Sequence, residues 1–154
     1  MKPSKQQGFT LIELLVVLAI IAILAALILS NLATARRKAR DAQRGTNVRA
    51  LAEAIEMFAY DNKYIYPIKT TLTAVTIYSD IHENFSSNYI KQIPQETAGK
   101  KYYYVSDDVG SEFAIFVPLE SKEDAWFCSV SGTYGEIITM ENPTKIEDCY
   151  LEGS

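Results

Sequence analysis

Gly-Phe-Thr-Leu-Ile-Glu occupies residues 8–13 of this chain, and sixteen consecutive apolar residues follow it from Leu14 to Leu29. As an α-helix, the segment from Phe9 to Leu29 would rise about 31 Å, which matches the hydrocarbon core of a bilayer at about 30 Å. Glu13 lies inside this segment, where a carboxylate costs on the order of 3 kcal/mol. The sequence therefore predicts a membrane-spanning helix whose glutamate has a functional partner.

Residues 8–17 resemble the prepilin cleavage and methylation motif of type IV pilins and of the pseudopilins of type II secretion and competence systems. The resemblance implies that a membrane peptidase cuts between Gly8 and Phe9. It also implies that the new N-terminal Phe9 is methylated on its nitrogen, and that assembly depends on Glu13.

The same resemblance predicts three parts: a leader peptide at 1–8, a transmembrane and filament-core half of a helix at 9–32, and an exported globular pilin domain at 33–154. The precursor would sit in the cytoplasmic membrane with its N-terminus inside, and the assembled filament would be extracellular. The positive-inside rule alone predicts the reverse orientation, because the basic run from Arg36 to Arg40 closely follows the span. We expect the orientation that the resemblance implies.

The spacing of Phe9 and Glu13 suggests how assembly would use the glutamate. Cleavage would give Phe9 an α-amine that normally titrates near pH ~8. Glu13 lies four residues on, about one helical turn away, and breaking a buried charge pair typically costs about 3–5 kcal/mol. Our hypothesis is that each incoming subunit pairs Glu13 with the Phe9 amine of its neighbour, which sets the axial register.

Two simpler interpretations compete with the filament. Ala33-Thr34-Ala35 would suit a secretory signal peptidase, but the apolar run is longer than a usual signal core and carries Glu13 near its start. Alternatively, the segment is a plain membrane anchor with Glu13 reaching the interface.

The expected fold is α+β, with one helix from Phe9 to about Tyr60 and a small antiparallel sheet packed on its second half. An apolar stripe predicts the packed face, and it comprises Val48, Leu51, Ala52, Ile55, Phe58 and Ala59. Basic residues that include Arg44 fall on other faces, with Asp41 within pairing distance of Arg37 or Arg44.

Strands are expected at Thr71–Tyr78, Lys101–Val105, Glu112–Val117, Ala125–Val130 and Tyr134–Thr139. The spacing of Ile81, Phe85 and Tyr89 by four predicts a short helix between the first two strands. We interpret Asp107-Asp108 and the acidic segment 120–124 as turn residues and solvated edges.

The two cysteines, Cys128 and Cys149, are too few for a zinc site of the usual ligand count. In an exported protein they predict one disulfide, and two free buried thiols are the alternative. His82, the single histidine, is expected to be solvated. The Asp-Pro and nearby Trp-Gly of secretion major pseudopilins are missing, so their calcium site is not carried over, and no metal or cofactor is expected.

The sequence is most simply interpreted as a structural subunit, the major pilin of a type IV pilus, and not as an enzyme. A pseudopilin of a type II secretion or competence system is the first alternative, and a membrane-anchored binding protein that never assembles is the second. The resemblance implies as partners other copies of the chain, a prepilin peptidase and methylase, and an assembly platform with its ATPase. Without Lys2 and Lys5 the chain has 13 basic and 19 acidic residues, so nucleic acid is expected as a partner only of a competence filament.

Overall fold

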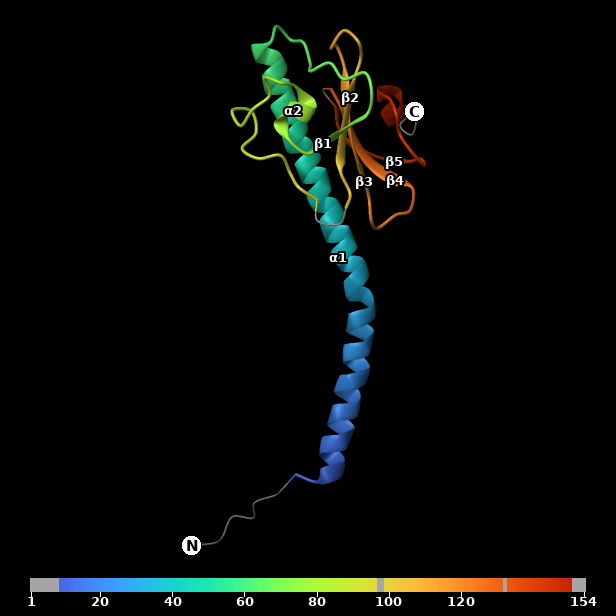
Figure 1. Cartoon of the computed structure of the whole chain (residues 1–154). Helices are drawn as coiled ribbons and strands as arrows, with labels where there is room; N and C mark the ends of the chain where they lie inside the picture. Colours follow the sequence, from blue (N-terminus) through green and yellow to red (C-terminus); the bar gives the residue numbers. More distant parts are fainter. Residues whose placement is uncertain (1–8, 97–98, 132, 151–154) are drawn as a thin grey trace. The chain divides into compact units, whose positions relative to one another are not determined.

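The structure is a computed structural model that describes residues 9–96, 99–131 and 133–150. Its elements, in chain order, are α1 (Leu11–Asp61), β1 (Thr73–Val75), α2 (Tyr78–Ile81), β2 (Tyr102–Ser106), β3 (Phe113–Pro118), β4 (Ala125–Val130), β5 (Thr133–Thr139) and the 3₁₀ helix η1 (Ile146–Tyr150) (Figure 1). The contacts within the chain divide it into two units, 1–37 and 38–154. The fold is α+β, as the sequence predicts.

The first unit contains the apolar part of α1. Its large apolar side chains from Phe9 to Leu29 are between 46% and 80% exposed. Among the described residues, α1 alone is long and apolar enough to cross a membrane. Burying this surface requires a bilayer or other protein.

The second unit is built around an antiparallel sheet whose strand order follows the sequence, β1-β2-β3-β4-β5. The predicted stripe on α1 packs against one face of this sheet, so the expected packing is confirmed. We call this the inner core, and it includes Leu51, Ile55 and Phe58 of α1 with Tyr104 and Ile115 of the sheet.

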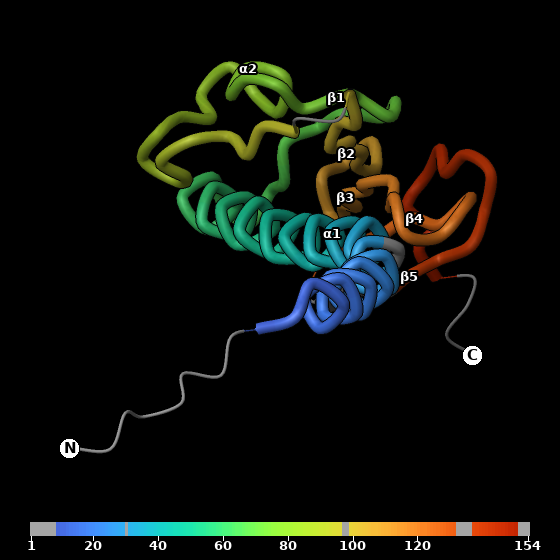
Figure 2. Tube along the Cα trace, turned by 90° about the horizontal axis from the view of Figure 1, so that it is seen from below, coloured from blue at the N-terminus to red at the C-terminus, as the bar shows by residue number. Residues whose placement is uncertain are grey.

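The other face of the sheet is also covered. Val105, Phe116 and Val130 pack there with Ile146 of η1, and we call this cluster the outer core. Residues of β3 alternate between the two cores, which is why five consecutive residues of that strand are buried. Figure 2 shows the C-terminal segment, in red, on the side of the sheet away from α1.

A disulfide closes the outer core. Cys128 of β4 and Cys149 of η1 are bonded, with their Cα atoms 6.0 Å apart, and both side chains are buried. A cross-link between residues 21 positions apart stabilises a fold by about 3 kcal/mol in the chain-entropy model.

The segment between α1 and β2 differs from its prediction. Only Thr73–Val75 of the expected strand at 71–78 forms β1, and the short helix is Tyr78–Ile81. Phe85 and Tyr89, which predicted a helix by their spacing, lie outside any helix and stack on each other with ring centroids 5.4 Å apart. Their spacing reflects packing on Phe58 of the inner core. The helix η1 was not predicted.

Gly110 fixes the turn between β2 and β3 against the segment that follows α1. Its carbonyl accepts a hydrogen bond of 2.9 Å from the Tyr66 amide, and its φ is +71°, which favours glycine. A Cβ at this position would lie 2.7 Å from Cγ2 of Ile65 and 2.7 Å from the carbonyl oxygen of Tyr66. A side chain at position 110 would therefore be disfavoured both by the positive φ and by the lack of space.

We expect Gly110→Ala to lower the free energy of unfolding by at least about 2 kcal/mol, because it adds a steric clash to the strain of a positive φ. Gly99→Ala is the matched control, since Gly99 has the same φ and no atom within 4 Å of the added Cβ. It should cost only about 1 kcal/mol. Urea unfolding of the full chain in detergent, followed by the fluorescence of the single tryptophan, Trp126, measures both. Equal losses would contradict the proposed clash.

Candidate assembly site

Thr10 and Glu13 form a reciprocal cap at the start of α1. The Glu13 carboxylate accepts hydrogen bonds from the Thr10 amide at 2.8 Å and from the Thr10 hydroxyl at 2.7 Å. In return, the Glu13 amide donates to the Thr10 hydroxyl oxygen at 3.3 Å. This is the capping box, which satisfies backbone donors that have no partner inside the helix. The carboxylate therefore has a partner within a single chain.

The predicted cleavage site is only partly within the described residues. Gly8 lies outside them, and Phe9 has 80% of its surface exposed. Cleavage, methylation and the pairing of Glu13 with a neighbouring Phe9 amine stay predictions. The capping box adds one condition, because such a pairing would compete with the hydrogen bonds from Thr10.

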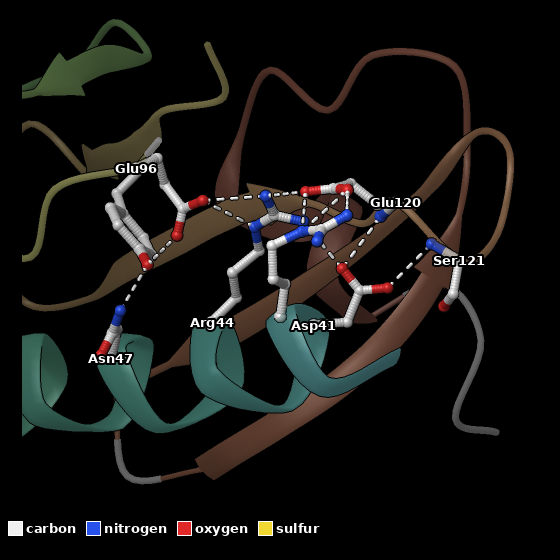
Figure 3. A network of polar contacts seen from close by, with 8 residues as sticks. Asp41, Arg44, Asn47, Glu96, Glu120 and Ser121 are labelled. Carbon is white, nitrogen blue, oxygen red and sulfur yellow. Dashed lines mark hydrogen bonds and ion pairs between the residues drawn. The ribbon is translucent and has the colours of Figure 1, made fainter. Parts of the chain in front are cut away.

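A charged network lies at the end of the second unit where α1 enters it, and Arg44 is its centre (Figure 3). Arg44 has no exposed surface. Its guanidinium contacts Asp41 at 2.8 Å, Glu96 at 2.8 Å, and Glu120 through a further ion pair. The prediction that Arg44 lies outside the packed face was wrong, whereas its expected pairing with Asp41 is confirmed.

The network joins α1 to two loops. Asp41 also accepts hydrogen bonds from the backbone amides of Glu120 at 2.9 Å and Ser121 at 2.8 Å. Glu96 accepts a hydrogen bond of 2.6 Å from the Tyr102 hydroxyl. Arg40, which is more exposed, pairs with Glu120 at 2.5 Å. Glu120, predicted to be a solvated edge residue, is therefore part of the packed unit.

These contacts shift the titration of the acidic groups. Hydrogen bonds from Arg40 and Arg44 lower the pKa of Glu120 from 4.5 to about 2. Burial by itself would raise the pKa of Asp41, but the hydrogen bonds from Ser121 and the Glu120 amide outweigh it, and the net shift is downward. Burial would likewise lower the pKa of Arg44, and its hydrogen bonds with Glu96 and Glu120 raise it instead.

The remaining candidates have structural roles. Asp107 accepts hydrogen bonds from Ser111 and the Glu112 amide, as expected of a turn residue. His82 is half-buried, and its ring centroid lies 5.1 Å from that of Phe58, so the expectation of a solvated histidine was wrong. Within the described residues, no group of three His, Cys, Asp or Glu side chains could hold a metal ion.

A Gly-Phe junction before a long apolar helix, followed by a small α+β domain, is typical of pilins and pseudopilins. Two family models match the chain in agreement with this class. Residues 3–29 match the prokaryotic N-terminal methylation motif, and residues 31–118 match type II secretion system (T2SS), protein G. The chain belongs to the type II secretion system protein G family.

The relatives that match are named type II secretion system core protein G. The protein from Vibrio cholerae is 34% identical over 111 residues, which cover 68% of this chain and 74% of the relative. The protein from Escherichia coli is 33% identical over 109 residues, covering 67% and 74%, and that from Aeromonas hydrophila is 31% identical over 120 residues, covering 75% and 84%. No solved structure was found to match the chain.

These matches favour the pseudopilin over the major pilin of a type IV pilus, which was our first interpretation. The match to protein G ends at Pro118, the last residue of β3. The strands β4 and β5 and the disulfide therefore follow the matched region.

We expect Arg44→Met to lower the free energy of unfolding by about 3–5 kcal/mol at pH 7, because it leaves three carboxylates close together without their buried cation. Arg40→Met is the matched control and should cost less than about 1 kcal/mol, since the Arg40 side chain is 43% exposed and its pair with Glu120 is open to solvent on that side. Urea unfolding of the full chain in detergent measures both.

The loss caused by Arg44→Met should shrink as the pH falls from 6 towards 3. Carboxyl groups with lowered pKa values stabilise the unmodified chain above their unfolded pKa, and that stability is lost as the pH falls towards about 2. In the variant, protonation instead relieves repulsion among the same groups. A loss that does not change with pH would argue against an electrostatic role for Arg44.

Proposed function

We propose that this chain is the structural subunit of a type II secretion pseudopilus, without catalytic activity of its own. It is made as a precursor anchored in the cytoplasmic membrane, cut between Gly8 and Phe9, methylated at Phe9, and assembled into a helical homopolymer. Its further partners are the prepilin peptidase and the assembly platform with its ATPase. The filament stays in the cell envelope.

The match of residues 31–118 to protein G carries this proposal. The exposed apolar surface between Phe9 and Leu29 supports it, because a helix that leaves the bilayer needs other apolar helices to cover it. Burial of apolar surface contributes about 25 cal/mol per Å². The cost of a carboxylate within the span supports it as well, although Glu13 also caps the start of α1 through Thr10.

Mass spectrometry of the N-terminal peptide tests the processing. We expect a mature chain that begins at methylated Phe9, found in membranes and depleted from filaments sheared off the cell surface. An abundant processed chain in the sheared fraction would indicate a surface pilus instead. A chain that still begins at Met1 would contradict any filament and leave a membrane anchor.

We expect Glu13→Leu to abolish filaments while the protein remains in the membrane, because the carboxylate that sets the register is missing. Electron microscopy of filaments from cells that overproduce the secretion system measures this. Glu83→Leu is the control, since it removes an exposed carboxylate from a loop of the second unit and should leave filaments unchanged. Normal filaments from Glu13→Leu would refute the register role.

A further inference from the structure

Exposed apolar side chains gather at one end of the second unit, around the C-terminus of α1. This tip patch consists of Met57, Tyr60, Tyr64, Ile65, Ile68 and Val109, which are 46% to 73% exposed. The rings of Tyr60 and Tyr64 meet edge to face with centroids 5.7 Å apart. Val109 joins the patch because the turn at Gly110 is bonded to Tyr66. Clusters of exposed apolar residues on this scale mark interaction sites, and Tyr and Met are enriched in them.

The backbone conformation that leaves Tyr64 exposed is energetically unfavourable. Lys63 and Tyr64 both have a φ of 62°, which is unfavourable for residues with a Cβ. The Tyr64 amide donates a 2.7 Å hydrogen bond to the Ala59 carbonyl, which ends α1 in this conformation. The left-handed turn therefore terminates α1 and leaves Tyr64 73% exposed beside Tyr60.

A groove lies at the other end of the same unit, between α1 and the last two strands. Its lining includes Lys38, Ala42, Gly45 and Arg49 of α1, Phe127 of β4 and Ile137 of β5, and its volume is about 380 Å³. We call it the foot groove. Its floor is apolar because Gly45 lets α1 lie close to the Phe127 ring, 3.3 Å from where a Cβ would be, and Ile137 remains 52% exposed. Asp41, Thr46 and Ser121 also line the groove.

Acidic residues predominate at the tip patch, and the cations Lys38 and Arg49 border the foot groove, where Asp41 is already paired with Arg44. Lys38 and Arg49 border the foot groove, and among the described side chains neither has a carboxylate within ion-pair distance. Glu53 and Asp61, both exposed, lie on the part of α1 that carries the tip patch. Asp61 also accepts a hydrogen bond from the Tyr89 hydroxyl, and the exposed Lys63 lies beside it. The neighbouring Glu56 already accepts a hydrogen bond from the Tyr66 hydroxyl. Opposite charges around matching apolar surfaces favour one orientation of contact.

A chain cannot fill its own groove with its own tip. The helical rise separates Lys38 from Asp61 by about 35 Å, and Figure 1 shows the end of α1 and the base of the sheet at opposite ends of the unit. A contact between two different surfaces of identical copies is heterologous, so it can propagate along a filament instead of closing into a dimer.

We infer that the tip patch of one copy binds in the foot groove of another copy of this chain along the filament, with Glu53 and Asp61 facing Lys38 and Arg49. This inference rests on the proposed function, because it requires a filament. It adds a contact between globular domains to the bundle of apolar helices.

Cysteine cross-linking in assembled filaments tests the contact. Thr46, exposed beside the groove, and Tyr60 of the tip patch are replaced in the full chain to give Thr46→Cys/Tyr60→Cys. The native cysteines do not interfere, since they are joined in a buried disulfide. After mild oxidation we expect a ladder of dimers, trimers and larger multimers on a non-reducing gel, while each single variant stays monomeric.

Several outcomes would overturn the inference. Processed filaments without a ladder would refute this contact and leave the proposed function intact. Dimers from Tyr60→Cys alone would indicate contact between two tips. Absence of filaments from the unmodified chain would refute the proposed function and the contact together.

Charge reversal provides a second test that does not use cysteines. Lys38→Glu/Arg49→Glu should lose most filaments, because both surfaces then have the same charge. Adding Glu53→Lys/Asp61→Lys to the same chain should restore them. Tryptophan fluorescence checks that each variant is folded, and a folded fourfold variant that forms no filaments would contradict the inference.

Discussion

The second unit depends on one buried cation. Arg44 has no contact with solvent, and a guanidinium in that position is tolerated only when charged partners surround it. Its three carboxylates come from α1, from the loop before β2 and from the loop after β3. The loops are therefore positioned by the helix, and the same arrangement leaves the foot groove open beside Gly45.

The second constraint is that α1 is one unbroken helix although its two halves carry different side chains. Between Leu11 and Asp61 its only glycine is Gly45 and it has no proline, so the element is continuous while its side chains change from uniformly apolar to a single apolar stripe. Its start is capped by Thr10 and Glu13. Its end is capped by the amides of Asn62 and Tyr64, which donate to the Ala59 carbonyl, while Lys63 adopts a left-handed conformation. Each end of the helix thus carries a residue that the proposed assembly uses.

Much of this architecture could be predicted from local patterns. The stripe on α1 and the runs of aromatic and β-branched residues at Lys101–Val105 and Ala125–Val130 are local signals. The helix and the last four strands lie within one or two residues of their predicted bounds. The structure of the segment from Thr71 to Tyr89 could not be predicted in this way, because its conformation depends on packing against Phe58.

In the candidate site, too, some residues could be predicted from the sequence and others could not. The importance of Glu13 could be predicted from its spacing to Phe9. The role of Thr10 could have been predicted as well, since Thr-Leu-Ile-Glu is a capping-box sequence. The partners of Arg44 could not, since Glu96 and Glu120 are 52 and 76 residues away from it. The tip patch escapes a sequence-based prediction for a similar reason, since nothing in the pattern of Tyr60 or Val109 shows that both stay exposed.

Because the sheet is covered on both faces, the two cores of the domain can form one after the other. Every fully buried residue of the inner core comes from positions 48–117, with the half-buried Phe127 packed against it, whereas the outer core also needs η1 and the bond between Cys128 and Cys149. If the domain is exported from the end of the span towards its C-terminus, as the proposed orientation requires, the inner core can be completed before η1 emerges. Under the proposed function, oxidation then closes the outer core, and the subunit reaches full stability only in the compartment where its filament is built.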